Sequence, residues 1–430
     1  MSARPAALLP FPDTAAVGEH GVAVGGVPLV DLVEAHGTPL YVYDATSIRS
    51  RATSVAAAVA GAPGGGSAVY ALKANPVLGL LRLVAACGLG ADCASAGEVA
   101  AALRAGIEGA HLVVHGNAKS DADIDAAIGA DAGLVVVDGR DDAERLAARC
   151  RAAGREQDVL VRIAPGIDVD THRHIATGHH GSKFGVVPEE GAALLRDLPE
   201  GLHGRGLHVH LGSQVLEPEP LLAAARWLPA FAQAEGLPLD VLDVGGGLGI
   251  RYLPEQPLPD PGLHTRALID AVATACGEAG LPVPHIIVEP GRSIVGQAGV
   301  TLYRVIGVKT VGDGSTWIAV DGGMGDNMRV GLYGAVYAPL VADRPLAPPD
   351  GVYRIAGRHC ESTDVIADGV ALPTPEVGDV IAVPATGAYH QSMAHAYNLF
   401  GRPAAVLVDD GEATVLTRRE TVDDLLARDT

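Results

Sequence analysis

Two hydrophobic patterns alternate along roughly the first 290 residues. Short apolar runs bounded by turn residues predict buried strands, and longer stretches with helical spacing of apolar positions separate them. Parallel strands need helical crossovers, so about eight such units predict a closed (β/α)8 barrel of the TIM type. The predicted strands are 69–73, 90–95, 111–115, 133–137, 158–163, 205–210, 239–243 and 285–288. The predicted helices are one capped by Asp44 or Thr46 that ends near residue 60, then 77–87, 97–105, 120–129, 141–153, 188–197, 218–235 and 262–279.

Beyond residue 300 the pattern changes to strands joined by turns, with few helices between them. This pattern predicts an antiparallel β domain, and we expect N-terminal strands near 21–30 and 38–43 to join it. We therefore predict a barrel over 46–303 and a β domain formed by 1–45 together with 304–430. The strands predicted for the β domain are 301–310, 315–320, 351–355, 380–383, 404–409 and 412–417.

Composition excludes several classes of partner and environment. The hydrophobic fraction of 48% supports a large core, and 31 basic against 51 acidic residues give a net charge of −20. That charge argues against nucleic acid and anionic membrane surfaces as partners. The five cysteines are scattered without CxxC spacing, which indicates a reducing cytoplasm and no zinc framework. Residues 1–17 contain prolines and an aspartate, so we expect neither a signal peptide nor a membrane span.

Polar side chains gather where the predicted barrel strands end. Catalytic groups of (β/α)8 barrels come from the C-terminal ends of the strands, so this gathering predicts an active site. Lys73 is either a reactive amine or a surface charge whose stem covers apolar residues. A lone lysine at a strand end is more often a surface charge. The polar residues at the other strand ends make the reactive amine the better interpretation here. They are Asp92, Asn117 with Lys119, Arg162, His210 with Ser213, Asp243 with Gly245, Gly246 and Gly247, and Glu289 with Arg292.

Taken singly, most of these residues also have structural interpretations. The run Gly245–Gly247 can cradle a phosphate or simply form a tight turn, and Ile250 breaks the GxGxxG pattern of dinucleotide sites. Ser213 can bind the same phosphate or cap a helix, and His210 can stack on a ligand or fill the core. Glu289 and Arg292 can form an ordinary surface ion pair. Cys360, beside Glu361, can be a buried apolar residue or a proton donor.

The clustered histidines His172, His174, His179 and His180 suggest a metal site at first sight. Their spacing matches no helical or hairpin pair of ligands, so we predict no metal there.

The strand-end residues match what pyridoxal phosphate requires. The lysine forms a Schiff base, glycines and a serine hold the phosphate, and a flat side chain covers the ring. A carboxylate that pairs with the pyridine nitrogen keeps it protonated, which favours heterolytic cleavage at Cα, as decarboxylation requires.

Nine motifs resemble those of the diaminopimelate decarboxylases, fold-type III pyridoxal phosphate enzymes related to ornithine decarboxylase and alanine racemase. The resemblance runs through nearly the whole chain. The motifs are YALKANP, HGNAKS, THRHIATG with SKFG, HVHLGSQ, DVGGGLGI, EPGRSIVGQAG, RVGLYGA, CES and GAYHQSMAHAYN.

The resemblance implies a set of roles in the conversion of meso-2,6-diaminopimelate to L-lysine and CO2. Lys73 would carry the cofactor and Cys360, supplied by the partner subunit of a homodimer, would protonate Cα. The cofactor would be bound by Lys73, Asp92, His210, Ser213, Gly245, Gly246, Gly247, Glu289, Gly291, Arg292 and Tyr389. The distal amino acid group of the substrate would be bound by Arg292, Arg329, Tyr333, Glu361 and Tyr389. A substrate with an amino acid group at both ends needs a cation and an anion at its far end, which Arg329 and Glu361 supply.

The sequence departs from the family pattern at two places. Thr363 stands where CESGD has glycine, and Val330-Gly331 follow Arg329 where RPxLYGA has proline. The alternative is therefore a related decarboxylase that acts on another amino acid in secondary metabolism.

Two alternatives from other classes remain open. A metal-dependent barrel hydrolase would use His208 and His210, although that class places its HxH on the first strand. A non-catalytic relative would bind the cofactor without turnover, which the presence of both Lys73 and Cys360 disfavours. A racemase is disfavoured too, because Glu289 suits an electron sink deep enough for decarboxylation.

Overall fold

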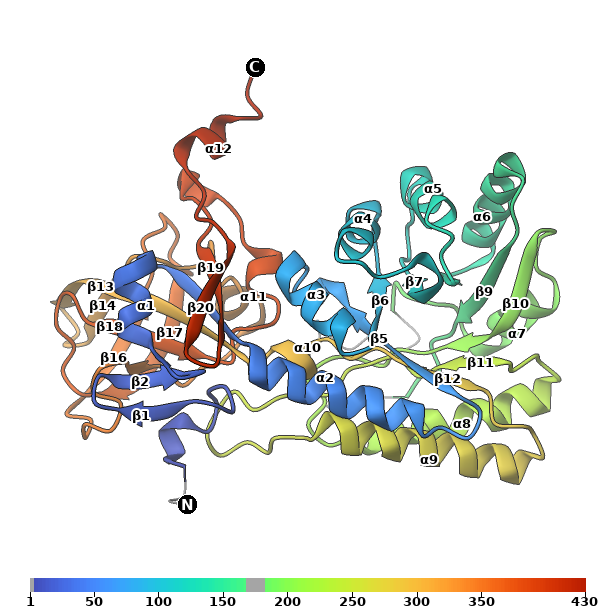
Figure 1. The fold of residues 1–430 in the computed structure, drawn as a ribbon, viewed down its shortest axis with the longest axis horizontal. Helices are drawn as coiled ribbons and strands as arrows, with labels where there is room; N and C mark the ends of the chain where they lie inside the picture. Colours follow the sequence, from blue (N-terminus) through green and yellow to red (C-terminus); the bar gives the residue numbers. More distant parts are fainter. Residues whose placement is uncertain (1–3, 168–181) are drawn as a thin grey trace. The chain divides into compact units, whose positions relative to one another are not determined.

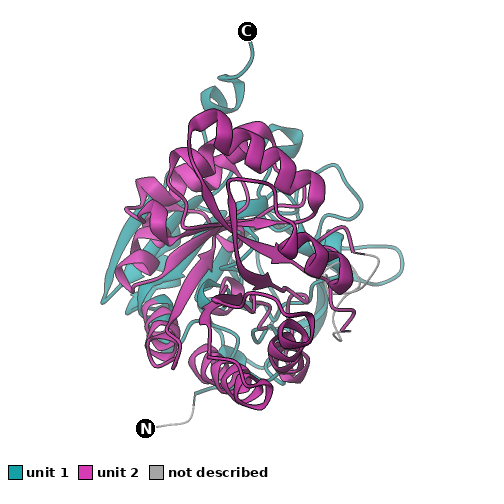
Figure 2. Ribbon diagram, turned by 90° about the vertical axis from the view of Figure 1, so that its right-hand side faces the viewer, with its two compact units in different colours: residues 1–48, 250–258, 294–430 teal, residues 49–249, 259–293 magenta. Residues whose placement is uncertain are grey.

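The computed structural model describes residues 4–167 and 182–430. The four clustered histidines, His172, His174, His179 and His180, lie outside the described residues. The chain forms two compact units, residues 1–48, 250–258 and 294–430 as unit 1, and residues 49–249 and 259–293 as unit 2 (Figure 2). Among the described helices, none combines the length and apolar character needed to cross a membrane.

Unit 2 is a closed barrel of parallel strands in sequential order, with helices around it (Figure 1), and the predicted fold is confirmed. Its strands are β5 (Gly66–Ala71), β6 (Gly90–Cys93), β7 (Leu112–Val114), β8 (Leu134–Val137), β9 (Gln157–Arg162), β10 (Leu202–His208), β11 (Val241–Asp243) and β12 (His285–Val288). Its helices are α2 (Ala45–Ala60), which begins in unit 1, α3 (Leu78–Ala86), α4 (Ala96–Arg104), α5 (Asp121–Gly129), α6 (Arg140–Ala153), α7 (Pro188–Arg196), α8 (Glu219–Glu235) and α9 (Pro261–Ala279).

Local sequence explains where these helices begin and end. Ser95 caps α4 by accepting from the Glu98 N–H, and Ser120 forms a reciprocal capping box with Asp123 on α5. Gly154 ends α6 in the left-handed conformation, which glycine adopts without strain. Local sequence therefore sets the starts of α4 and α5 and the end of α6.

The barrel interior carries one apolar layer, made by Val69, Val113, Val136, Leu160 and Ile287. These side chains come from β5, β7, β8, β9 and β12, and they are buried. Side chains of this kind pack the interior of such barrels, and the polar groups discussed below lie beyond this layer, at the C-terminal ends of the strands.

Unit 1 is built on one mostly antiparallel sheet, with strand order β17-β16-β14-β13-β4-β19-β20 and the pair β15–β18 attached through β13. Two neighbouring pairs, β14–β16 and β4–β19, run parallel, which the expected antiparallel domain did not include. The strands are β4 (Leu40–Asp44), β13 (Gly299–Thr310), β14 (Thr316–Val320), β15 (Leu340–Val341), β16 (Gly351–Ala356), β17 (Val365–Leu372), β18 (Val380–Pro384), β19 (Ala404–Asp409) and β20 (Glu412–Thr417).

The N-terminal segment supplies more than sheet strands to unit 1. Strand β4 pairs with β13 and β19, as expected for 38–43. The region near 21–30 instead forms a small separate sheet and the start of a helix. These elements are β1 (Ala16–Gly18), β2 (Gly21–Val24), β3 (Val27–Pro28) and α1 (Leu29–His36); the remaining short helices are α10 (Arg292–Val295), α11 (Arg329–Tyr333) and α12 (Val422–Leu426).

The unit boundaries differ from the expected division at 303/304. Strand β13 begins at Gly299 and pairs with β4 and β18, so the chain has joined unit 1 before that point. Residues 250–258 also belong to unit 1, because Ile250 and Tyr252 lie in its hydrophobic core beside Tyr303 and Tyr337.

Candidate active site

Lys73 lies immediately after the first barrel strand. Strand β5 ends at Ala71, and a 3-10 turn over Leu72–Ala74 carries the lysine. Leu72 and Ala74 are fully buried and fix the turn, while half of the Lys73 side chain (50%) is exposed. Its Nζ lies 4.0 Å from Asp92 Oδ2. The chain therefore presents a solvent-accessible amine at the C-terminal mouth of the barrel, beside one carboxylate.

Glu289 follows strand β12 and is surrounded by histidines. Its Oε1 lies 2.8 Å from His115 Nε2 and 3.2 Å from His208 Nε2. Its Oε2 lies 3.7 Å from His210 Nδ1. Only 3% of the Glu289 side chain is exposed, so the surface ion pair is the wrong interpretation.

Electrostatics assign charges to this centre. Burial by itself raises the pKa of Glu289, but His115 and His208 outweigh it and hold the pKa well below its ordinary value. Burial first, and then the Glu289 charge, raises the pKa of Asp243 well above its ordinary value. Burial also lowers the pKa of His208 to about 3. The surroundings therefore favour the ionised form of Glu289, the protonated form of Asp243 and the neutral form of His208.

The same four groups offer the only cluster of possible metal ligands within the described residues. One atom each of His115, His208, Asp243 and Glu289 lies within 4.8 Å of the others. Two ligands of one tetrahedral zinc ion stand about 3.3 Å apart, given metal–ligand distances of about 2.0–2.1 Å. The 2.8 Å between His115 Nε2 and Glu289 Oε1 is shorter and is the distance of a direct polar contact. The geometry favours a direct contact over a shared ion.

Gly245, Gly246 and Gly247 form a turn after β11 that only glycine fits. A Cβ on Gly246 would lie 2.2 Å from the Glu289 carbonyl oxygen, and Gly245 and Gly247 have φ of +70° and +112°. The Gly245 N–H donates to Asp243 Oδ1 at 2.8 Å, and the Gly246 N–H to His210 Nδ1 at 3.3 Å. The turn thus fixes the backbone against both His210 and Glu289.

Arg292 and Ser213 meet at the same end of the barrel. The guanidinium Nη2 donates to Ser213 Oγ at 2.8 Å, and Arg292 is buried. Gly291 makes this position possible, since a Cβ there would press on Ala71 and Ala74 at 3.0 and 3.1 Å. A guanidinium beside a hydroxyl is a suitable donor set for a phosphate.

The donors in unit 2 fit pyridoxal phosphate. A half-exposed amine, a buried carboxylate, an imidazole with 14% of its side chain exposed and a guanidinium–hydroxyl pair all lie at strand ends of one barrel. Each matches one requirement of the cofactor, namely its aldehyde, pyridine nitrogen, ring face and phosphate.

Three predicted strand-end residues have other surroundings. Lys119 turns away from the site and lies 2.7 Å from Asp142 Oδ2, donating also to the carbonyl oxygens of Gly116 and Val136 at 2.8 Å each. Arg162 is buried, with its guanidinium carbon 4.6 Å from the centre of the Phe184 ring. Asn117 is half-buried. Lys119 is therefore a structural residue.

Replacing Lys119 by methionine is expected to lower the free energy of unfolding by about 3–5 kcal/mol, because Asp142 would stay buried without its cation. Denaturant unfolding of Lys119→Met beside Lys309→Met, which removes an exposed lysine, measures the difference. A loss no larger than that of the control would contradict the structural role.

His115 and His208 are site residues that the strand-end argument missed. His115 directly follows β7, two residues before Asn117, so the same argument could have found it. His208 lies two positions before His210, and alternate residues of a strand share a face. Both signals were present in HGNAKS and HVHLGSQ.

In unit 1, aromatic rings surround Arg329. The buried Arg329 Nη1 donates to the hydroxyls of Tyr252 and Tyr337 at 2.9 and 3.0 Å. Its guanidinium carbon lies 6.0 Å from the Tyr333 ring centre and 5.9 Å from that of Tyr389. The structure thus brings three predicted substrate residues together and adds Tyr252 and Tyr337 to them.

Cys360 and Glu361 lie on an exposed loop of unit 1. The Cys360 N–H donates to Asn398 Oδ1 at 2.9 Å, and the Cys360 carbonyl accepts from the Tyr397 hydroxyl at 3.4 Å. Glu361 is exposed and its Oε1 accepts from the Ser362 N–H at 2.9 Å. No ion pair joins Glu361 to Arg329 in the described part of the chain. The loop backbone is held by these hydrogen bonds, and Cys360 and Glu361 are both exposed.

The two departures from the family pattern contact each other. A Cβ on Gly331 would lie 3.4 Å from the Thr363 carbonyl oxygen and 3.7 Å from the Thr363 Cβ. Position 331 on α11 therefore lies beside Thr363, and a small side chain there would meet Thr363 at ordinary van der Waals distances.

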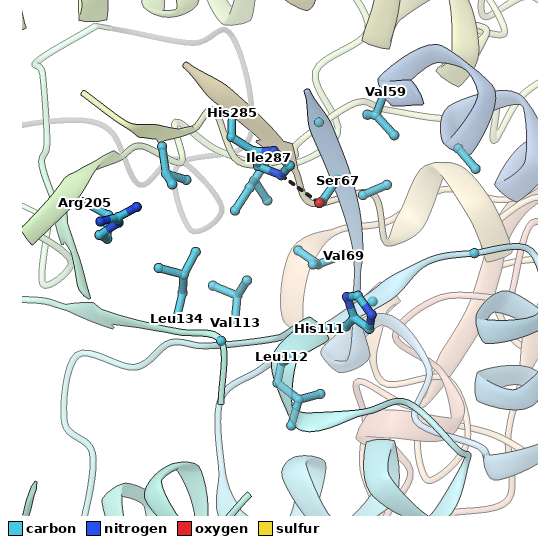
Figure 3. A pocket seen from close by; sticks show the side chains of 18 of the residues that line it. Val59, Ser67, Val69, His111, Leu112, Val113, Leu134, Arg205, His285 and Ile287 are labelled. Atoms are coloured by element: carbon cyan, nitrogen blue, oxygen red, sulfur yellow. Dashed lines mark hydrogen bonds between the residues drawn. The ribbon is translucent and has the colours of Figure 1, made fainter. Parts of the chain in front are cut away.

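A cavity of about 450 Å³ opens at the opposite, N-terminal end of the barrel (Figure 3). It is lined by strand starts that include Ser67, Leu134 and His285, with His285 Nε2 2.8 Å from Ser67 Oγ. None of the predicted site residues lines it. Active sites of this fold lie at the other end of the strands, so the site described above is the better candidate.

Comparison with known proteins agrees with this geometry. Residues 45–296 match the family "Pyridoxal-dependent decarboxylase, pyridoxal binding domain". A diaminopimelate decarboxylase of Actinosynnema pretiosum subsp. auranticum is 43% identical, with 94% of this chain and 92% of the relative covered. The crystal structure of diaminopimelate decarboxylase from M. jannaschii in complex with L-lysine has a TM-score of 0.88 at 31% identity, covering 97% of this chain and 98% of the other. That from Helicobacter pylori, also with L-lysine, has a TM-score of 0.84 at 31% identity, covering 93% and 98%. With this similarity along nearly its whole length, the chain belongs to the diaminopimelate decarboxylase family of pyridoxal phosphate-dependent enzymes.

Proposed function

We propose that this chain converts meso-2,6-diaminopimelate to L-lysine and CO2, the last step of lysine biosynthesis. The observation that carries the proposal is the half-exposed Lys73 amine at the barrel mouth that also holds the buried Glu289 carboxylate. Relatives of the same length bear the activity in their names, and two related structures hold L-lysine.

Pyridoxal phosphate, when bound, accepts the electron pair left as the bond between Cα and the carboxylate breaks. Around it, we assign Lys73 to the covalent attachment and Asp92 to the neighbourhood of that amine. Ser213, Arg292 and the backbone of Gly245–Gly247 and Gly291 hold the phosphate. His210 covers the ring, Tyr389 contacts cofactor and substrate, and Glu289 keeps the proton on the pyridine nitrogen.

Recognition of the distal end falls to unit 1 in this proposal. Arg329 and Tyr333, together with Arg292, bind the distal carboxylate, and Glu361 binds the distal ammonium. The hydroxyls of Tyr252 and Tyr337 hold one Arg329 nitrogen, which limits the rotation of its guanidinium. A fixed planar cation discriminates a carboxylate from the bare end of a simple diamine.

Cys360 supplies the proton to Cα, and we assign it to the site of the partner subunit in a homodimer. An exposed thiol on a loop held by Asn398 and Tyr397 suits that role. A cytoplasmic location belongs to the same proposal, since lysine biosynthesis uses cytoplasmic metabolites and the chain's cysteines are free.

Carbon dioxide release from meso-diaminopimelate, lysine, ornithine and arginine tests the substrate. We expect purified protein to be yellow and its kcat/KM for meso-diaminopimelate to exceed that for ornithine by at least about 10³-fold, because a buried arginine left unpaired penalises the shorter substrate. Activity with ornithine and none with diaminopimelate would contradict the assignment of the pocket but not of the cofactor.

Two further measurements exclude the other classes. A metal-dependent hydrolase would contain stoichiometric zinc, which elemental analysis of the purified protein detects. A non-catalytic relative would bind pyridoxal phosphate and turn yellow but release no carbon dioxide from any of the four amino acids.

A further inference from the structure

A cluster of buried titratable groups lies behind Glu289, and the proposed function gives it no role. His115, His208 and Asp243 come from β7, β10 and β11 and converge on the carboxylate that follows β12. The exposed fractions of the His115 and His208 side chains are 9% and 1%. The two imidazole rings contact edge to face, with centres 4.8 Å apart at 64°.

The contacts divide the Glu289 carboxylate into two halves. Both His115 Nε2 and His208 Nε2 approach Oε1, at 2.8 and 3.2 Å. The nearest histidine to Oε2 is His210, whose Nδ1 is 3.7 Å away and already accepts from the Gly246 N–H. The two buried histidines therefore approach the carboxylate on its Oε1 side, and His210 approaches it on its Oε2 side.

A buried carboxylate needs polar or cationic groups close to it to stay ionised. Burial without hydrogen bonds favours the protonated form strongly, whereas N–H donors favour the anion. The neighbours that face Glu289 also include Asp92, 3.6 Å from His115 Nε2, and Asp243, whose Oδ1 is held by the Gly245 N–H. A negative charge on either carboxyl would oppose ionisation of Glu289, and the two histidines would have to outweigh it.

We propose that His115 and His208 are positioning residues that hold Glu289 as an anion, with Oε2 left for the pyridine nitrogen of the cofactor. The inference rests on the proposed function, specifically on the pairing of Glu289 with that nitrogen. It assigns a role to His115 and His208 that requires no contact with the cofactor.

The protonation of the pyridine nitrogen provides the test. Protein loaded with pyridoxal phosphate labelled with ¹⁵N in the ring is compared by ¹⁵N NMR, whose chemical shift distinguishes protonated from unprotonated pyridine. His115→Leu is expected to move the shift toward the unprotonated value and to weaken cofactor binding about tenfold or more. His115→Gln keeps an N–H donor and is expected to restore most of the shift.

His285→Gln is the matched control. His285 begins the strand that leads to Glu289 but lies at the other end of the barrel, against Ser67 (Figure 3). It is expected to leave the shift unchanged. A wild-type shift in both His115→Leu and His208→Leu would overturn the positioning role.

Glu289→Gln separates this inference from its premise. If Glu289→Gln changes the shift while the histidine variants do not, only the positioning role is overturned. If Glu289→Gln leaves the shift unchanged, Glu289 does not pair with the nitrogen and the proposed function of that residue fails.

If a variant no longer binds the cofactor, its Glu289 can still be measured in the cofactor-free protein. Infrared spectra of the cofactor-free protein, with the Glu289 band assigned by its loss in Glu289→Gln, report the carboxylate directly. We expect the carboxylate band to give way to a carboxylic acid band in His115→Leu, and its retention would overturn the proposal.

Discussion

Replacing Lys73 by alanine is expected to lower kcat by at least about 10³-fold, because both the covalent attachment of the cofactor and an amine at the reacting carbon are lost. The variant should fold, since half of the side chain is exposed and its neighbours Leu72 and Ala74 anchor the turn. Steady-state carbon dioxide release measures the rate, and circular dichroism checks the fold.

Borohydride treatment identifies the lysine independently of activity. The chain has four lysines, Lys73, Lys119, Lys183 and Lys309, so peptide mapping after reduction assigns the labelled one without ambiguity. We expect the cofactor on Lys73 in the unmodified protein, no label in Lys73→Ala, and normal labelling in Lys309→Ala. Label on any other lysine would remove Lys73 from the proposed attachment.

Position at a strand end was informative because a parallel barrel brings all such ends to one mouth. Ser213 and Arg292 are 79 residues apart in sequence, yet their side chains meet at 2.8 Å. Glu289 was expected near His210, and the structure places them 3.7 Å apart. The order of strands, and therefore these meetings, follows from the alternating pattern alone.

The direction of a side chain beyond a strand end did not follow from the pattern. Lys119 comes five residues after β7, and its ammonium forms an ion pair with Asp142 on α6. That outcome depends on how α6 packs, which is a tertiary contact. His115 shows the opposite case, since its position directly after β7 turns it inward to Glu289.

Long-range pairing was the other feature beyond the reach of periodicity. The parallel pairs β4–β19 and β14–β16 in unit 1 join segments far apart in the chain, and strand patterns carry no direct record of such partners. The segment 250–258 carries the apolar residues Ile250 and Tyr252. The sequence pattern does not show that they pack in the core of unit 1 rather than in unit 2.

The surroundings of Arg329 indicate why tyrosine gathers there. A buried guanidinium without any carboxylate partner needs neutral acceptors for its N–H groups, and the Tyr252 and Tyr337 hydroxyls accept from one of its nitrogens, Nη1. Burial by itself lowers the pKa of Arg329. The two tyrosines outweigh burial and raise that pKa above its ordinary value. Because no carboxylate within the described residues neutralises Arg329, its charge remains for an anionic ligand.

Replacing Cys360 by alanine is expected to lower kcat by about 10²–10⁴-fold, the usual contribution of a positioned proton donor or acceptor. Stability should change little, because the thiol is exposed and the loop is held through the Cys360 backbone by Asn398 and Tyr397. Carbon dioxide release and the enantiomeric purity of the lysine product measure the effect. Cys360→Ser, which keeps a weaker proton donor, is expected to retain more activity than Cys360→Ala.

Mixing two inactive variants tests whether the thiol acts in the partner's site. If each site of a homodimer takes Lys73 from one subunit and Cys360 from the other, a hybrid of Lys73→Ala and Cys360→Ala subunits has one intact site and one doubly defective site. Random exchange makes half of the dimers hybrid, so an equal mixture should recover about a quarter of normal activity. If both residues served the same subunit's site, every site would lack one of them and the mixture would stay inactive. The recovered activity depends only on which subunit supplies Cys360 to each site. The mixture therefore distinguishes a shared site from a self-contained one, whereas each single variant loses activity in both cases.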